Sequence, residues 1–212
     1  MGSATDGVLG ASDGGGAYVI ERTESGWDRW SPLAPLPPPP GRVWRVIVHR
    51  RKLAAVSVFI PIPGAFGPIR GDGTDLVKGE VHLFERRAEG WVAVATLRSP
   101  RREAYDGFGN FVAIQDGWLA ITDPGDSLVG EVAGAAFLYR QVGDEWRYQL
   151  VAEPDDSGGQ LGMGAVFCDD ELLLLGAPGL SMQNHNGAVA AVDLKLVGYD
   201  SRARALPVLP AP

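Results

Sequence analysis

The chain has a single cysteine among its 212 residues, Cys168, so an intramolecular disulfide and a thiolate-bound metal site are excluded. Its three histidines, His49, His82 and His185, are far apart in the sequence, and none belongs to a His-Glu-x-x-His motif. Long apolar runs are also absent. The longest candidate, residues 53–66, is broken by prolines and is shorter than the ~20 residues of a membrane span. We therefore expect no membrane insertion.

Positive charge is scarce as well. The formal net charge is −7 and no basic stripe occurs, which disfavours a nucleic acid or an anionic membrane as partner. The first 16 residues lack the basic and apolar regions of a secretory signal, so the sequence itself predicts no export. Hydrophobic residues make up 45% of the chain, which is ordinary for a soluble globular protein.

A repeat, in contrast, is clearly present. In three copies a glycine opens a short apolar strand and about a dozen residues later a tryptophan starts a second strand, and a fourth copy keeps only the first strand. The copies are GAYVIERTESGW (16–27), GEVHLFERRAEGW (79–91), GAAFLYRQVGDEW (134–146) and a fainter GAVAAVDL that starts at 187. The opening glycines are 63, 55 and 53 residues apart. A period of this length is typical of propeller blades and similar arrays.

The third copy predicts four antiparallel strands in one meander. Residues 108–114 and 119–122 are joined by an Asp116-Gly117 turn, and 135–141 pairs with 146–153. The first and fourth copies each provide three recognisable strands. We predict an all-β, β-propeller-type domain over residues 1–198 and a proline-rich tail over 199–212. The predicted blades span approximately 8–36, 42–100, 106–154 and 160–194.

Two motifs connect these strands to a known family. Phe108-Gly109 before an apolar strand, and Gly176-Ala177-Pro178, are the two halves of the motif that gives the FG-GAP repeat its name. The chain resembles the FG-GAP, integrin-α-like β-propeller family in its bacterial form, over roughly residues 8 to 194. The resemblance implies a ligand-binding or adhesive role without catalysis, and a location outside the cytoplasm. Leu161-Gly162 replaces Phe-Gly in the fourth repeat, and Gly10-Ala11-Ser12 replaces Gly-Ala-Pro in the first.

The family binds calcium in its A–B hairpins, between the first two strands of each blade. Here these hairpins are too short to wrap a cation, and one of them, residues 49–52, is basic. We therefore expect no metal and no cofactor. Scattered oxygen donors occur in the loops around Asp72, Asp123 and Asn184, where we interpret them as solvated turn residues.

The repeat geometry also predicts where a partner binds. The B–C and D–A connections lie at one end of every blade and include the long segments of the chain, and long loops on a rigid scaffold are common binding sites. The longest is 59–78, which mixes apolar and charged residues as a protein contact does. The candidate binding residues are Phe59, Ile62, Phe66, Ile69, Arg70, Asp72, Asp75, Asp123, Asp126, Asn184 and His185.

The sequence thus predicts a non-catalytic interaction module that binds a protein or a glycan. Two alternatives remain open. One is a hydrolase or lyase with acidic residues near the propeller axis, and the other is a structural piece of a longer repeat protein.

The tryptophans Trp27, Trp91 and Trp146 share one repeat position and are expected to pack between blades, whereas Trp44 and Trp118 are expected to be more exposed. Unpaired strand edges near residues 8–12 and 187–194 predict either closure within one chain or a homodimer.

Overall fold

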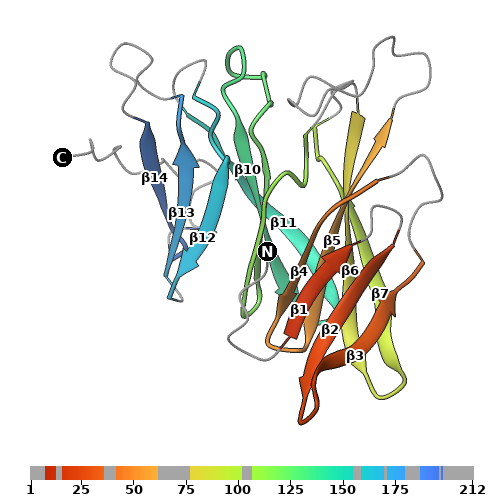
Figure 1. Ribbon diagram of the computed structural model, residues 1–212. Helices are drawn as coiled ribbons and strands as arrows, with labels where there is room; N and C mark the ends of the chain where they lie inside the picture. Colours follow the sequence, from red (N-terminus) through yellow and green to blue (C-terminus); the bar gives the residue numbers. More distant parts are fainter. Residues whose placement is uncertain are drawn as a thin grey trace. The chain divides into compact units, whose positions relative to one another are not determined.

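The computed structural model describes residues 8–12, 16–35, 42–61, 77–101, 107–154, 159–169, 171–179, 187–195 and 197. Over these residues the protein is all-β, with four antiparallel sheets and no helix (Figure 1). The chain divides into two compact units, Met1–Gly109 and Asn110–Pro212, and each unit contains two of the sheets. Among the described residues no helix is long and apolar enough to cross a membrane.

Unit 1 contains the first two sheets. The first has the strand order β1-β2-β3 and the second the order β4-β5-β6-β7, so each strand pairs with its neighbour in sequence. The strands are β1 (Val8–Ser12), β2 (Ala17–Thr23), β3 (Gly26–Leu33), β4 (Arg42–His49), β5 (Leu53–Pro61), β6 (Val77–Arg87) and β7 (Gly90–Arg98).

Unit 2 repeats this plan in the opposite order, with a four-stranded sheet before a three-stranded one. The third sheet has the order β8-β9-β10-β11 and the fourth the order β12-β13-β14. The strands are β8 (Val112–Gln115), β9 (Trp118–Asp123), β10 (Ala135–Val142), β11 (Glu145–Ala152), β12 (Gly164–Cys168), β13 (Leu172–Ala177) and β14 (Ala188–Asp193). The predicted meanders, of four strands in the second and third repeats and three in the first and fourth, are therefore confirmed.

Tight turns explain why the strands pair locally. β8 and β9 are joined by Asp116-Gly117, as the sequence predicted, and Gly117 has a φ of +75°. β10 and β11 are joined by Gly143-Asp144, in which Gly143 has a φ of +61°. Glycine adopts such angles without a steric penalty, so both turns are encoded locally.

The prediction of a strand over 108–114 is wrong at its start. Phe108 to Phe111 form a turn, and β8 begins only at Val112. Phe108 is fully buried and Gly109 has a φ of +97°, a left-handed conformation that no regular strand contains. Leu161-Gly162 repeats this geometry before β12, with Leu161 buried and Gly162 also at +97°. The substitution of leucine for phenylalanine thus leaves the turn unchanged.

The opening glycine of the cassette is explained by close packing against this turn. A Cβ added to Gly79 would lie 1.8 Å from the backbone oxygen of Phe108. A Cβ on Gly134 would lie 2.3 Å from the backbone nitrogen of Leu161, and the two residues form an isolated parallel bridge. Only glycine permits such a close approach. The periodic glycine therefore lies where the turn that begins the next repeat, at Phe108 or Leu161, packs against the start of the strand.

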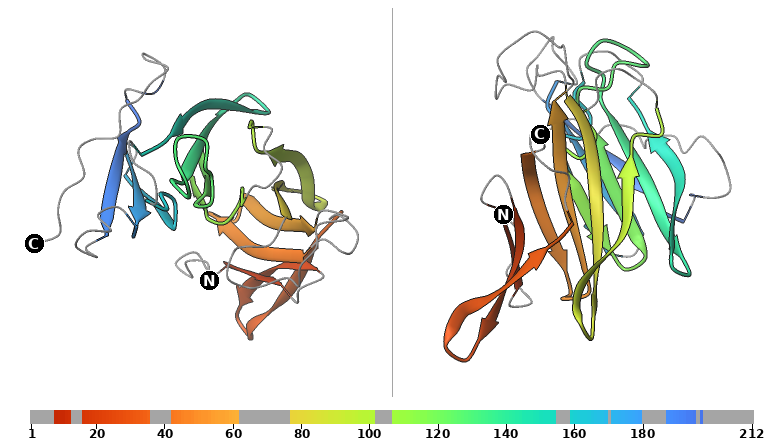
Figure 2. Two further views of the ribbon diagram at one scale, coloured as in Figure 1. Left: turned by 90° about the horizontal axis from the view of Figure 1, so that it is seen from above. Right: turned by 90° about the vertical axis from the view of Figure 1, so that its right-hand side faces the viewer.

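The two sheets of unit 1 share one hydrophobic core (Figure 2). β1 lies against β4 so closely that a Cβ on Gly10 would be 2.6 Å from the Val46 oxygen. The buried members of this core are Ala17, Val19, Leu33, Val46, Ala54, Val56, Val58, Phe84 and Trp91.

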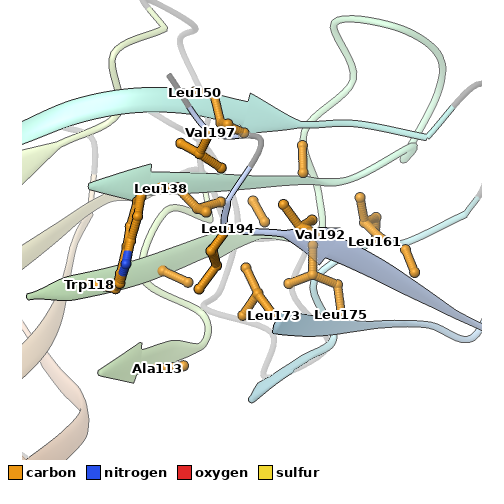
Figure 3. Close-up of a cluster of buried hydrophobic side chains, with 14 of the residues drawn as sticks. Ala113, Trp118, Leu138, Leu150, Leu161, Leu173, Leu175, Val192, Leu194 and Val197 are labelled. Carbon is orange, nitrogen blue, oxygen red and sulfur yellow. The ribbon is translucent and has the colours of Figure 1, made fainter. Parts of the chain in front are cut away.

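Unit 2 has a core of its own between its two sheets (Figure 3). Leu138 and Leu150 of the third sheet point toward Leu173 and Leu175 of the fourth, and Leu194 closes one side. Further buried members are Ala113, Trp118, Ala120, Ala136, Ala152, Leu161, Ala177, Ala190, Val192 and Val197.

The tryptophans follow the sequence expectation only in part. Trp91 is a core residue and Trp44 is exposed, as expected, but Trp118 is buried and Trp27 is exposed. Trp118 belongs to β9, a strand in which every residue is buried. The Arg140 guanidinium lies 5.0 Å from the centre of the Trp118 ring. Trp27 is exposed because it lies on the side of the first sheet that faces away from the unit 1 core.

Candidate functional site

Three of the predicted binding residues lie in the described part of the chain. Phe59 is a half-buried residue of β5 whose ring packs against that of Trp44, with 5.7 Å between the ring centres. Asp123 is the last residue of β9, and Asp126 lies in the connection from β9 to β10. The other predicted residues are outside the described residues: Ile62, Phe66, Ile69, Arg70, Asp72, Asp75, Asn184 and His185.

Asp123 and the β9–β10 connection that follows it form a loop with two buried carboxylates at its base, and we call residues 123–134 the 123–134 loop. Asp123 and Asp126 are only 2% and 3% exposed, so their interpretation as solvated turn residues is wrong. Oδ1 of Asp123 accepts a hydrogen bond from the Gly125 amide at 3.0 Å, and Oδ1 of Asp126 accepts one from the Leu128 amide at 3.1 Å. Both side chains therefore help to shape the loop.

Backbone hydrogen bonds close the same loop. The Gly134 amide donates to the Asp126 oxygen at 2.9 Å, and the Ala133 amide donates to the Gly130 oxygen at 3.1 Å. The Ser127 hydroxyl accepts from the Val132 amide at 3.0 Å. Hydrogen bonds thus stabilise the loop at several points along its length.

This rigid loop presents apolar side chains to solvent. Leu128 is 62% exposed and Val129 is 47% exposed, directly after the buried Asp126. Exposed aliphatic side chains on a preorganised loop lose little conformational entropy on binding, which favours contact with another apolar surface. The sequence analysis chose this loop for its aspartates and did not select Leu128 or Val129.

A second polar group lies in unit 1, on the paired strands β6 and β7. Glu80 is opposite Arg98, and His82 is opposite Thr96. Oε1 of Glu80 accepts from Arg98 Nε at 2.6 Å, and the Thr96 hydroxyl is 3.1 Å from Nδ1 of His82. Oε2 of Glu80 is 3.2 Å from Nε2 of His82. We call these four residues the Glu80 cluster.

Burial affects the protonation of His82. Glu80 and His82 are each 8% exposed. Loss of solvation lowers the pKa of His82; the Glu80 carboxylate opposes this shift and the Arg98 guanidinium adds to it. Nε2 of His82 makes no hydrogen bond of good geometry, although Glu80 is near. The cluster therefore combines a buried carboxylate with a neutral imidazole.

Comparison among the repeats shows that this cluster is specific to the second. Counted from the opening glycine, the positions of Glu80 and His82 carry Ala17 and Val19 in the first repeat, Ala135 and Phe137 in the third, and Ala188 and Ala190 in the fourth. Five of these six counterparts are buried and all are apolar. The fold itself therefore does not require polar side chains at these positions.

The sequence analysis missed Glu80 and Arg98, and treated His82 as an isolated residue that could face solvent. The available signal was the alignment of the repeats, because a glutamate and a histidine at positions that are apolar in three copies are visible without a structure. The Arg98 partner could not be found in this way, since it depends on the register of β6 with β7.

No metal site emerges among the described residues, where no group of three or more histidine, cysteine, aspartate or glutamate side chains could hold an ion. Cys168 is half-buried at the end of β12. The A–B hairpins in this part of the chain are tight turns, as the sequence indicated.

No family model matches this chain, and no curated protein matches its sequence.

Proposed function

We propose that the protein is a non-catalytic interaction module of β-propeller type that binds a partner protein through the loops at one end of its sheets. The observation that carries this proposal is the 123–134 loop, which is held by two buried aspartates and exposes Leu128 and Val129. Aliphatic tips suit an apolar patch on a protein, whereas a glycan site needs aromatic platforms and polar donors.

The propeller arrangement is supported by the repeat geometry. The second and third repeats are four-stranded meanders, and their opening glycines lie against equivalent buried turns at Phe108 and Leu161. A conserved crossing of this kind stacks successive sheets, and stacked meanders are the building plan of propellers.

The enzymatic alternative would draw on the Glu80 cluster. That cluster contains a single carboxylate, whereas glycoside hydrolysis needs two that flank the scissile bond. The residues at the positions of Glu80 and His82 are apolar in the other repeats, so the described residues do not repeat this cluster from blade to blade. The structural evidence therefore favours binding over catalysis.

The test is substitution of the loop tip. The double variant Leu128→Asp and Val129→Asp is expected to abolish crosslinking of the chain to its partner in an extract of the source cells, with partners identified by mass spectrometry. Val142→Asp is the matched control, because Val142 is 44% exposed at the opposite end of the same sheet. The control variant should capture the same protein as the unmodified chain.

Thermal unfolding of all three chains checks that the substitutions leave the fold intact. A partner that crosslinks equally to the tip variant contradicts binding through this loop, and so does a partner that is lost only with Val142→Asp.

A further inference from the structure

One repeated position identifies the same face in all four sheets. It is the first residue of the Gly-Ala-Pro motif, Gly176, and its counterparts are Gly10 in the first sheet, Ser57 in the second and Thr122 in the third. Ser57, Thr122 and Gly176 each pair with the second residue after an opening glycine. Because successive residues of a strand point to opposite faces, each sheet has a motif face on this side and a reverse face on the other.

In unit 1 the motif face of the first sheet packs against the reverse face of the second. Val19, which is opposite Gly10, is a core residue. The second sheet contributes Val56 and Val58, the two neighbours of Ser57, so its motif face points away from this core.

Unit 2 follows the same rule. Ala136, which is opposite Thr122 on the motif face of the third sheet, is a core residue. The fourth sheet contributes Leu175 and Ala177, the two neighbours of Gly176, and thus its reverse face. In both units, therefore, the motif face of the earlier sheet packs against the reverse face of the later one.

The reverse face of the first sheet and the motif face of the fourth are exposed. On the first sheet Trp30 is 58% exposed, and Tyr18 and Ile20 are half-buried. On the fourth sheet Val166 and Val189 are 53% and 51% exposed. In contrast, residues of the second sheet's motif face and the third sheet's reverse face are buried: Val81, Leu83, Phe137 and Tyr139. The two exposed faces are one of each kind, the two halves of the interface found in both units.

The motif position contacts the following sheet in both units. A Cβ on Gly10 would be 2.6 Å from the Val46 oxygen of the second sheet. The Thr122 hydroxyl donates to the oxygen of Gly162, in the turn before β12. Among the described residues, the atoms within 4 Å of a Cβ on Gly176 belong to Gly164 of its own sheet. The motif face of the fourth sheet thus lacks, within the described part of the chain, the neighbour that this rule places on it.

The two exposed faces are also complementary in size. The Tyr18 and Trp30 rings of the first sheet lie in an edge-to-face contact with 6.0 Å between their centres. On the fourth sheet Gly164 is opposite Gly176, so no side chain rises from the middle of the face, and Val189 borders it. Large side chains on one sheet facing small ones on the other is the arrangement that lets paired sheets interdigitate.

Charge matches at the hairpin ends of the two faces. The exposed Arg22 is on the reverse face of the first sheet, and Asp193 is on the motif face of the fourth. An ion pair of the same polarity already crosses between the two sheets of unit 1, where Nη2 of Arg86 on a reverse face is 3.7 Å from Oε1 of Glu21 on a motif face. Opposite charges at equivalent ends favour association in one orientation.

We infer that the reverse face of the first sheet binds the motif face of the fourth sheet of a second copy of this chain. The rings of Tyr18 and Trp30 cover the glycine pair, and Arg22 pairs with Asp193. Because each copy has one face of each kind, the contact can be formed twice in a closed pair. It uses the faces of the sheets rather than their edges, and it does not depend on the function proposed for the 123–134 loop.

Cys168 reports on this contact, because it is the single cysteine and lies on the motif face of the fourth sheet, opposite Leu172. The test measures the rate at which a maleimide alkylates Cys168 over a range of chain concentrations, with the proportion of dimer taken from light scattering. The rate is expected to fall at least threefold as the chain dimerises. Trp30→Asp, on the first sheet, is expected to abolish this protection of the fourth, because it places a charge against an apolar face.

Trp44→Asp is the matched control, because Trp44 is 52% exposed but belongs to the second sheet, and it should leave the protection unchanged. Protection that does not depend on concentration, yet is lost in Trp30→Asp, means that the two faces meet within one chain and overturns the second copy as occupant. A chain that stays monomeric with a constant alkylation rate overturns the inference, as does a dimer whose Cys168 is alkylated equally fast with and without Trp30→Asp.

An exchange of charges covers the case in which Trp30→Asp unfolds. Arg22→Glu and Asp193→Arg each place like charges in the contact, so each variant alone is expected to dimerise more weakly than the unmodified chain. An equimolar mixture of the two variants should regain the dimer, because every contact between them again joins an acid and a base. A mixture that associates no better than either variant alone overturns the pairing of these two faces.

Discussion

Ser57 and Thr122 occupy the same position in two repeats, since each lies opposite the second residue after an opening glycine. The Thr122 hydroxyl donates to the Gly162 oxygen at 2.7 Å and accepts from the Phe111 amide at 3.1 Å. The Ser57 hydroxyl is equally buried, yet it has no hydrogen-bond partner among the described residues. One hydroxyl therefore stabilises its sheet, while the other loses its solvation without compensation.

Replacing each hydroxyl-bearing residue by an apolar one should therefore affect the free energy of unfolding differently at the two positions. Thr122→Val is expected to lower the free energy of unfolding by about 1–3 kcal/mol, because it removes the buried hydroxyl that makes both hydrogen bonds. Ser57→Ala should leave stability unchanged or raise it. Urea denaturation of both variants measures the difference. A loss of more than about 1 kcal/mol in Ser57→Ala would show that the hydroxyl has a partner after all.

His82 makes stability depend on pH. Burial lowers its pKa in the folded protein below the usual value of 6.5, so the unfolded chain binds the proton more readily. This contribution to stability is present above pH 6.5 and is lost as the pH falls below that value. His82→Phe, which introduces the residue of the third repeat, should flatten the stability profile between pH 7 and 5. Thermal melts across this range measure it, and an equal slope in both chains would contradict the assignment.

At the scale of the strand, the opening glycine carries the packing between repeats. Gly79→Ala would place a Cβ 1.8 Å from the Phe108 backbone oxygen, which no side-chain rotation can relieve. We expect this variant to lose several kcal/mol of stability or to fail to fold. Gly164→Ala in β12 is the control, because no atom lies within 4 Å of its Cβ and its φ is not positive. Equal melting temperatures for the two variants would refute the packing role.

The strands could be predicted from sequence because their determinants are local. Short apolar runs and the turns at Asp116-Gly117 and Gly143-Asp144 predict β8 to β11 without any distant contact. The start of β8 could not be placed, since Phe108 and Gly109 leave the strand conformation in order to pack against Gly79, nearly thirty residues earlier. The Glu80 cluster was missed for the same reason: its partners meet only through cross-strand register.

At the scale of the whole molecule, self-association follows from the sheet edges. Within the described residues β1 pairs only with β2, and β14 only with β13, so neither strand forms a hydrogen-bonded ladder on its other edge. An open edge is a template for another strand. We expect these two edges either to meet within one chain or to join two chains with two-fold symmetry, and light scattering at micromolar concentration separates the two states.

Deletion of residues 1–14 removes β1 and tests the contact. A dimer that survives this deletion contradicts association through that edge, and a strict monomer whose two edges are far apart contradicts both forms of pairing.

The uninterrupted meander also has a consequence for how the chain folds. Among the strands that the structure describes, every hydrogen-bonded pair joins neighbours in sequence, so none of these pairs depends on a distant segment. Even the longest connection, residues 62–76 between β5 and β6, costs only about 0.3 kcal/mol more in closure entropy than the eleven residues between β9 and β10. Such local topology favours rapid folding for an all-β protein. Each sheet can form as soon as its last strand leaves the ribosome, which shortens the time that its apolar faces are exposed to other chains.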